Sequence, residues 1–160
     1  MKLKKMAALA AAALLSLSLM AGCSQSGGKA ITAPTEDIAR KLQESLSFEY
    51  PLNQLPEEAA NRLYKLEGDL IEEQSVYVGT GGALADEVSV WRVKDEKDAE
   101  TVKEAAETRV ENQKVSFKDY VPAEMPKLEK AVITVSGDTV ILCVSSDPDK
   151  AKEVIASFEE

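Results

Sequence analysis

An α+β domain, in which helices cover a mainly antiparallel four-stranded sheet, is the fold class that the sequence predicts. Four segments carry apolar residues at the spacing of amphipathic helices. Four shorter segments either alternate apolar and polar residues or are apolar throughout, as strands are. These segments follow the order α-α-β-β-α-β-β-α. A Gly-containing turn joins each pair of neighbouring strands, which favours antiparallel pairing.

Capping and breaking residues bound the first two helices. The first helix opens at Thr35, a residue that suits a helix N-cap, and ends before Pro51. The second begins at Pro56 and ends at Gly68. The residues expected to face the core from these helices are Ile38, Leu42, Leu46, Ala59, Leu63 and Leu66.

The second half of the chain contains the strands and two further helices. The strands are expected at residues 71–78, 87–93, 131–135 and 139–144, with a proline-containing loop at residues 118–128 before the second pair. A long helix is expected from Asp98 to about Ser116. The last helix is expected to start with Asp147 as its cap and Pro148 as its first residue. Because residues 139–144 are apolar on both faces, this strand is predicted to be central.

Residues 1–22 have the organisation of an export signal. A short basic start precedes an apolar stretch from Met6 to Met20. About 15 residues at 1.5 Å each span about 22 Å, less than the ~30 Å hydrocarbon core, which disfavours a transmembrane helix. Small residues and a cysteine follow the stretch. The segment is therefore predicted to be removed as a signal peptide.

The residues Met20, Ala21, Gly22 and Cys23 resemble the lipobox of bacterial lipoproteins. In that class the cysteine thiol receives a diacylglyceryl group and becomes the new N-terminus. Met20 stands where the class usually has Leu. The resemblance implies that lipid on Cys23 anchors the protein to the cell membrane, with its domain on the extracytoplasmic side. An ordinary cleaved signal and an uncleaved transmembrane anchor are the alternatives.

This interpretation divides the chain into three parts. Residues 1–22 form the signal peptide, residues 23–34 the lipidated cysteine and a flexible tether, and residues 35–160 one globular domain. Removal of the lysines in the signal lowers the net charge from −9 to −12. So acidic a domain is unsuited to nucleic acid and to anionic lipid headgroups. The lipid, and not the domain surface, is therefore expected to hold it at the membrane.

A series of dispersed residues between about 63 and 158 has a characteristic order and spacing. They are Leu63, Tyr64, Asp86, Glu87, Val88, Trp91, Arg92, Val93, Lys94, Arg109, Gln113, Phe117, Tyr120, Pro122, Gly137, Ile155 and Phe158. In these residues the chain resembles a lipoprotein family of Clostridia-like Gram-positive bacteria, the domain of unknown function number forty-three fifty-eight. The resemblance implies lipoprotein topology and one compact domain, and it brings no activity and no binding residues.

The sequence contains no recognisable catalytic or metal-binding motif. It has no histidine, which removes His general bases, His metal ligands and Ser-His or Cys-His pairs. The Gly-rich turn at residues 79–82 lacks the Lys-Ser/Thr of a phosphate-binding loop, and residues 147–149 lack EF-hand spacing. Once Cys23 is acylated, Cys143 is the remaining thiol, and its apolar strand suits core packing. No metal and no cofactor is expected.

Aromatic and arginine side chains are the candidates for a binding surface. Tyr77, Trp91, Arg92 and Tyr120 are selected because such side chains are enriched at recognition sites. The alternatives are core packing for Trp91 and structural pairing with carboxylates for Arg92 and Arg109. The leading hypothesis is a non-catalytic binding or accessory module for an envelope or protein partner. A small-ligand or cation-binding lipoprotein is the alternative, and an enzyme is disfavoured. A concave pocket with convergent polar groups would favour the alternative, and an exposed apolar patch beside the sheet would favour the leading hypothesis.

Overall fold

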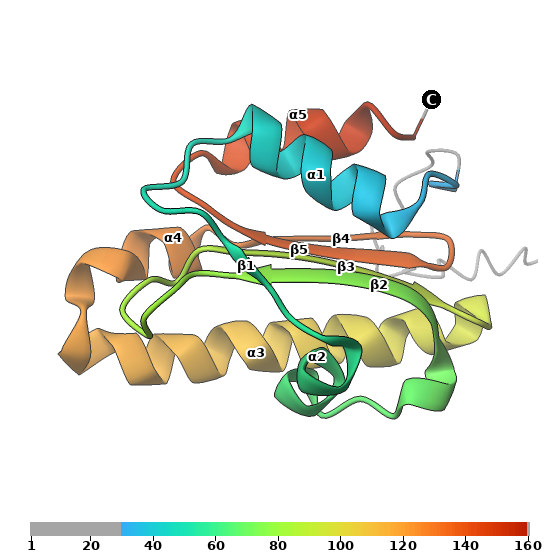
Figure 1. Cartoon of the computed structure of the whole chain (residues 1–160), viewed down its shortest axis with the longest axis horizontal. Coiled ribbons are helices and arrows are strands. Elements are labelled where there is room, and N and C mark those ends of the chain that lie inside the picture. The colour runs from blue at the N-terminus through green and yellow to red at the C-terminus, as the bar shows by residue number, and fades with distance from the viewer. Residues whose placement is uncertain (1–29, 160) are drawn as a thin grey trace, which may run out of the picture.

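A five-stranded antiparallel sheet forms the centre of the structure, a computed structural model that describes residues 30–159 (Figure 1). The strands pair in the order β1-β2-β3-β5-β4. Their bounds are Asn53–Gln54 for β1, Ile71–Val78 for β2, Glu87–Val93 for β3, Val132–Ser136 for β4 and Thr139–Val144 for β5. Every pair of neighbouring strands is antiparallel, so the mixed helix-and-sheet class and the antiparallel sheet are confirmed.

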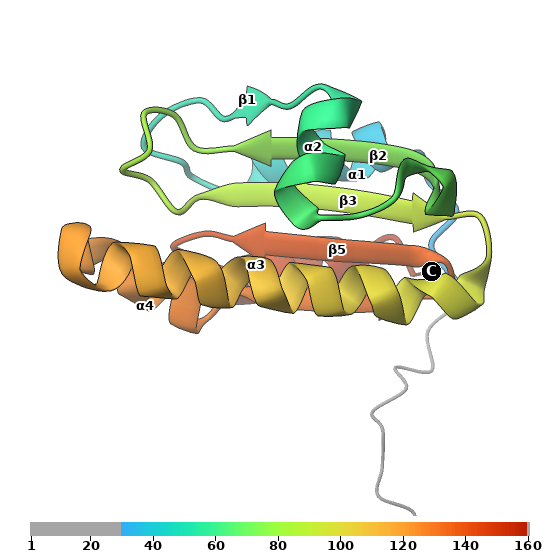
Figure 2. The ribbon, with the colours of Figure 1, turned by 90° about the horizontal axis from the view of Figure 1, so that it is seen from below.

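Helices cover both faces of this sheet, as the two perpendicular views show (Figures 1 and 2). On one face lie α1 (Thr35–Ser45) and α5 (Pro148–Ala156), and on the other lie α2 (Glu57–Tyr64) and α3 (Ala99–Tyr120). The shorter helical segments are α4 (Met125–Glu129), η1 (Gly68–Leu70), η2 (Glu96–Asp98) and η3 (Pro122–Glu124). Because it is covered on both faces, β5 is buried along its whole length. This burial confirms the prediction that residues 139–144 form a central strand.

The sheet separates two apolar cores. Successive side chains of a strand point to opposite faces, so β3 and β5 contribute to both cores. Trp91 and Leu142 pack on the α3 side, whereas Val90 and Ile141 pack on the side of α1 and α5. The alternation expected for residues 87–93 is therefore confirmed.

The number of strands differs from the prediction, which had four. The additional strand β1 consists of two exposed polar residues, Asn53 and Gln54, that pair with Val78 and Tyr77 at the edge of β2. Two polar residues carry no hydrophobic period from which a strand can be recognised. Their extended conformation depends on the neighbouring strand and not on their own side chains.

The segment expected to be a loop at residues 118–128 is largely helical. α3 continues beyond Ser116 to Tyr120, and η3 and α4 follow directly. Pro122 and Pro126 lie in the first turns of these short helices, where a missing N–H costs no helical hydrogen bond. The prolines that suggested a loop therefore begin helices.

Among the described residues, packing against the core already includes Ile31, inside the segment expected to be a tether. Ile31 is 1 % exposed and belongs to the core beneath α1. Arg92 donates from Nη2 to the carbonyl oxygen of Ala33 at 2.6 Å, which holds the segment against β3. Thr35 does not cap α1, because its hydroxyl bonds to that of Ser75 at 3.0 Å instead. The small, polar composition around one buried isoleucine concealed this packing, which lies before the expected boundary at residue 35.

α2 presents a different face to the sheet from the one expected. Ala60 and Tyr64 are buried, whereas Ala59, Leu63 and Leu66 are half-buried at the side of the helix. A short helix with apolar residues on two adjacent faces does not specify which of them points inward. Tyr64 is selected by its packing on the sheet and by polar partners described below.

Shortening Ile31 to Ala is expected to lower the free energy of unfolding by about 2–4 kcal/mol, because a buried site beneath α1 is emptied. Urea denaturation followed by circular dichroism measures the change. Val115→Ala is the matched control, since Val115 is 78 % exposed and its truncation should alter stability by less than about 0.5 kcal/mol. Equal stability of the Ile31→Ala and unsubstituted proteins would show that the segment before α1 is not part of the fold.

Candidate functional site

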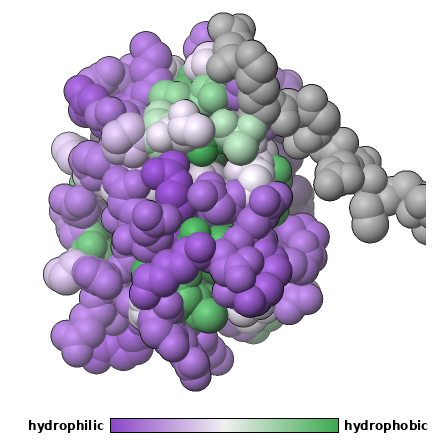
Figure 3. Space-filling view, turned by 90° about the vertical axis from the view of Figure 1, so that its right-hand side faces the viewer, coloured by the Kyte–Doolittle hydropathy of each residue, from purple (hydrophilic) through white to green (hydrophobic). Residues whose placement is uncertain are grey.

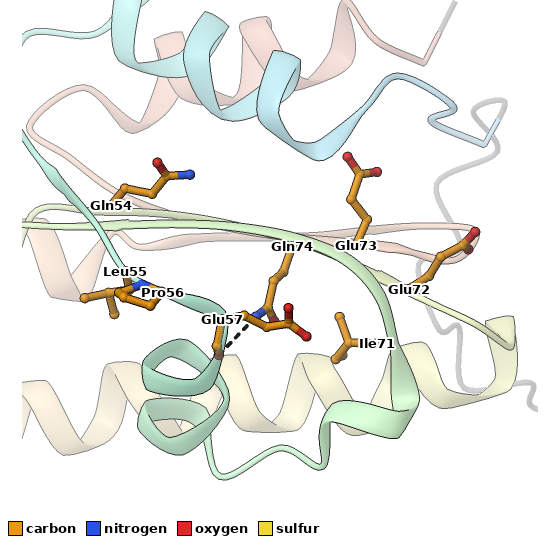
Figure 4. A pocket seen from close by; sticks show the side chains of 8 residues that line it. All are labelled: Gln54, Leu55, Pro56, Glu57, Ile71, Glu72, Glu73 and Gln74. Carbon is orange, nitrogen blue, oxygen red and sulfur yellow. Dashed lines mark hydrogen bonds between the residues drawn. The ribbon is translucent and has the colours of Figure 1, made fainter.

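A groove of about 540 Å³ runs along the outer side of β2, next to β1 and the start of α2. Its side chains diverge, as Figure 4 shows. Gln54 and Glu73 point toward the α1 side of the sheet, Gln74 and Ile71 point toward the α2 side, and Glu72 points away from both. Because its polar groups do not converge, this groove has no common point at which to hold a small ligand.

A cleft of about 480 Å³ lies between α2, α3 and the β2–β3 loop. Its apolar walls come from α2, β2 and the loop, and most of its polar groups come from one side of α3. The lining residues are Leu55, Ala59, Leu63, Val78, Gly79, Gly82, Leu84, Asp86, Arg109, Asn112, Gln113, Ser116 and Phe117. Convergent polar groups within apolar walls are typical of a ligand site, so this cleft is the candidate functional site.

Behind the Arg109 wall of the cleft, the carboxylate of Glu87 is 0 % exposed and has partners on both oxygens. The hydroxyls of Tyr64 and Ser89 donate to Oε1 at 2.5 and 3.0 Å. Arg109 donates from Nε and Nη2 to Oε2 at 3.1 and 2.9 Å. A buried carboxylate is tolerated only when it is paired and hydrogen-bonded in this way. The network joins α2, β3 and α3.

Arg109 is held in a fixed orientation by this network, while one of its nitrogens stays available. Among the described residues, nothing accepts a hydrogen bond from its Nη1. Burial, together with the charge of Glu87, raises the pKa of Tyr64 well above its ordinary value, so its hydroxyl stays protonated and keeps donating. The guanidinium therefore provides a pre-oriented donor at the wall of the cleft.

Gln113 lies one helical turn beyond Arg109 on the same side of α3. It is 6 % exposed, and within residues 30–159 its buried Oε1 has no hydrogen-bond partner. A buried polar atom without a partner costs about 1–3 kcal/mol. After a rotation of the amide, a donor bound in the cleft would satisfy this oxygen and relieve the cost.

A second polar cluster holds the end of the β2–β3 loop beside the cleft. Lys127 bonds to Asp86 Oδ2 at 2.9 Å and to Glu124 Oε2 at 3.0 Å. Glu124 Oε2 also accepts the N–H of Ala85 at 2.8 Å. Burial raises the pKa of Asp86, and Lys127 offsets this effect only in part. For Lys127, burial acts to lower the pKa, but its bonds to both carboxylates outweigh burial and raise the pKa. The loop is thereby fastened to α4.

The buried network and the described surface differ in what they can offer to a bound molecule. Glu87 and Tyr64 are buried behind Arg109 and face no open space, so neither reaches a bound molecule. No group of three His, Cys, Asp or Glu side chains within residues 30–159 is arranged to hold a metal ion. In the same range, no helix has both the length and the apolar character needed to cross a bilayer.

The four residues selected from the sequence for a binding surface do not come together. Trp91 is fully buried against Tyr64 on the α3 side of the sheet, so its core-packing alternative is the correct one. Tyr77 and Arg92 lie on the opposite face, where Tyr77 donates to Glu36 at 2.6 Å. Tyr120 is 71 % exposed at the end of α3. These four side chains therefore do not form one continuous surface in the structure.

The described residues do not include the lipobox residues Met20, Ala21 and Gly22 or the lipidation residue Cys23.

The structural alternative for the two arginines is confirmed. Arg92 pairs with Glu73 at 2.9 Å, and Arg109 pairs with Glu87.

The family resemblance, and not any chemical motif, singled out four residues at or behind the cleft in the sequence. Tyr64, Glu87, Arg109 and Gln113 are among the dispersed residues on which the family resemblance rests. No catalytic or binding motif contains them, because they come from three different elements. The structure brings all four to one side of the sheet, at the cleft or directly behind it.

The model of the family described as Domain of unknown function (DUF4358) matches residues 44–145. The chain belongs to this family. The match includes all five strands together with α2, α3 and α4, and therefore the whole cleft, whereas α5 and most of α1 lie outside it. No curated protein and no solved structure matches the chain. DUF4358 brings no activity with it, so the function is argued below from the geometry.

Cys143 is expected to be unreactive toward a polar maleimide in the native protein and reactive in denaturant. It is buried in β5, and this burial raises the pKa of its thiol to about 12, which keeps it protonated. Cys143→Ala should cost about 1 kcal/mol, and Cys143→Asp should cost far more because it buries an unpaired charge. Rapid labelling of the folded protein with tolerance of Asp would contradict the packing described for β5.

Proposed function

We propose that this protein is a non-catalytic binding domain whose cleft accepts a small neutral group that carries an amide. The observation that supports the proposal is the meeting of Arg109 and Gln113 in the cleft, a pre-oriented donor beside an acceptor without a partner. An amide offers a carbonyl oxygen to the first and an N–H to the second. The group belongs either to a free small molecule or to an exposed part of an envelope or protein partner.

The charge of the site favours a neutral ligand over an anion. Glu87 neutralises Arg109, and the carboxylate of Asp86 also lines the cleft. A phosphate or carboxylate would therefore meet no net positive charge, in a chain whose overall charge is −9. A cation would meet the donor nitrogens of Arg109. An uncharged polar group fits both sides of the site.

The volume of the cleft agrees with recognition of a small molecule. Its volume of about 480 Å³ lies within the usual range for small-molecule sites, about 300–1,000 Å³. Leu55, Leu63, Leu84 and Phe117 provide apolar walls for the remainder of a ligand. The end of the molecule in Figure 3 is mostly hydrophilic, and its apolar areas are small and separate. Such a face is not typical of docking on a broad apolar surface.

The domain is placed, in this proposal, on the extracytoplasmic side of the cell membrane by lipid on Cys23. The resemblance of residues 20–23 to a lipobox, after a basic and apolar start, supports this location. Two acyl chains provide stable anchoring, since each buried CH₂ contributes about 0.8 kcal/mol. The domain itself needs no affinity for lipid.

Mass spectrometry of the membrane-extracted protein is expected to find a chain that begins at Cys23 and carries a diacylglyceryl group. Cys23→Ser removes the thiol that accepts the lipid, so this modification should disappear. Detergent partitioning provides the second measurement. A Cys23→Ser chain that is still membrane-bound after removal of residues 1–22 would contradict the anchor.

Gln113→Leu is expected to abolish binding in the cleft while leaving the free energy of unfolding unchanged or slightly higher. The substitution removes a buried polar atom that has no native partner, so no folding interaction is lost. N-acetyl amino acid amides are suitable probes, because they are neutral and carry both amide groups. Their saturable binding should shift the NMR signals of the backbone amides of Gly79, Gly82 and Asn112.

The matched control for this experiment is Val115→Ala, on the exposed side of the same helix. It should keep both the shifts and their saturation. If Gln113→Leu binds the probes as well as the unsubstituted protein does, the cleft assignment is refuted. A large loss of stability in Gln113→Leu would instead show that Gln113 serves the fold.

A further inference from the structure

The two edges of the sheet are protected to very different degrees. At the β1–β2 edge, the pairing of β2 with β3 is irregular between Ile71 and Glu73, the charged Glu72 is exposed, and α2 lies alongside. Bulges, charges and covering helices are the devices that stop edge strands from pairing with other chains. β4 forms the opposite edge, where α3 packs against one face of the strand but the described residues include no bulge and no further strand. Its register with β5 is regular throughout, and its residues include no charge, proline or glycine.

The outer side of β4 presents backbone groups that pair with no other strand within residues 30–159. Val93 donates its N–H to the carbonyl of Asp138, and hydrogen-bonded residues alternate along antiparallel strands. The backbone groups of Ile141 therefore point away from β3 and toward β4, where Ile141 is opposite Thr134. Thr134 thus forms its backbone hydrogen bonds with β5. The N–H and C=O groups of Ile133 and Val135 therefore point outward, where no strand among residues 30–159 pairs with them.

We propose that β4 pairs with β4 of a second copy of this chain, antiparallel and about a two-fold axis at Thr134, so that the two sheets become continuous. In this register Ile133 of each copy exchanges both backbone hydrogen bonds with Val135 of the partner subunit. Thr134 then faces its own counterpart in a non-hydrogen-bonded pair, with Cα atoms about 4.5 Å apart. Self-complementary pairing of this kind is what a two-fold interface requires.

Charges beyond the two ends of β4 are complementary in this register. Lys130, just before the strand, is exposed and forms no ion pair with another described residue. Asp138, in the turn just after the strand, is accessible and lies 3.7 Å from Arg92 of its own chain. Pairing centred on Thr134 brings Lys130 of each copy beside Asp138 of the partner subunit, and opposite charges across a strand pair stabilise the pairing. A shifted register separates these charges and leaves some outward backbone groups unpaired.

The interface is small, so association in solution is weak and covalent capture is the appropriate test. The full chain with Cys23→Ser and Thr134→Cys is oxidised with copper phenanthroline and examined on a non-reducing gel. Facing Cα atoms at about 4.5 Å suit a disulfide, for which about 4.4–6.8 Å is usual. Ser136→Cys in the same background is the control, and because Ser136 is buried, maleimide labelling of both folded variants corrects for the accessibility of their thiols. Ser136 lies on the same strand face, but in the proposed register its counterpart is about 13 Å away.

The Thr134→Cys chain is expected to form roughly tenfold more disulfide-linked dimer than the Ser136→Cys chain, because only the former places two thiols within bonding distance. Sedimentation at a protein concentration high enough to populate the dimer of the unsubstituted chain provides a second readout. Thr134→Lys puts like charges opposite each other and should shift the protein to monomer, whereas Thr134→Val should leave the association unchanged. Equal cross-linking of the two cysteine variants would overturn the proposal. So would a Thr134→Lys chain that sediments like the unsubstituted protein.

Discussion

The buried carboxylate of Glu87 is the group on which the placement of α2 and α3 over the sheet depends. It comes from the central strand β3, and its oxygens are bound by Tyr64 of α2 and Arg109 of α3. Removing one partner of a buried charge pair typically costs about 3–5 kcal/mol, because the other charge is left uncompensated. Apolar packing tolerates small shifts of a helix, whereas these directional bonds do not. The hydrogen bonds to this carboxylate therefore favour one defined arrangement of α2, β3 and α3.

The same network determines which polar groups reach the cleft. Arg109 is committed to Glu87 through Nε and Nη2, so its charge is neutralised and its orientation is set. Gln113, on the same side of α3, has no hydrogen-bond partner for its Oε1 among residues 30–159. Fold stability is provided by the two apolar cores, and among the described side chains with a buried polar atom that has no partner, Gln113 is the one that lines the cleft. α3 therefore contributes Arg109 to the network that holds the fold and Gln113 to the proposed binding site.

The two layers of helices separate the start of the described chain from the cleft. Ile31 packs beneath α1, so the chain enters the fold on the face opposite the cleft. A lipid anchor before residue 30 would be attached to this layer, away from the proposed ligand. The open edge of β4 lies beside both layers and contains no residue of the cleft. The proposed tether, the proposed ligand site and the proposed self-association therefore involve separate parts of one small domain.

The sequence by itself determined the helices and strands with a strong apolar period, the central position of β5 and the resemblance to DUF4358. It also predicted the export signal and the lipobox. These are properties of neighbouring residues, so local patterns are sufficient to specify them. Only the tertiary structure decided that Ile31 is buried, that Asn53 and Gln54 form a strand, and that Trp91 is not on a surface. Tyr64 and Arg109 are separated from Glu87 by 23 and 22 positions in the chain. No local pattern specifies which carboxylate meets which arginine, because that pairing depends on how the helices pack across the sheet.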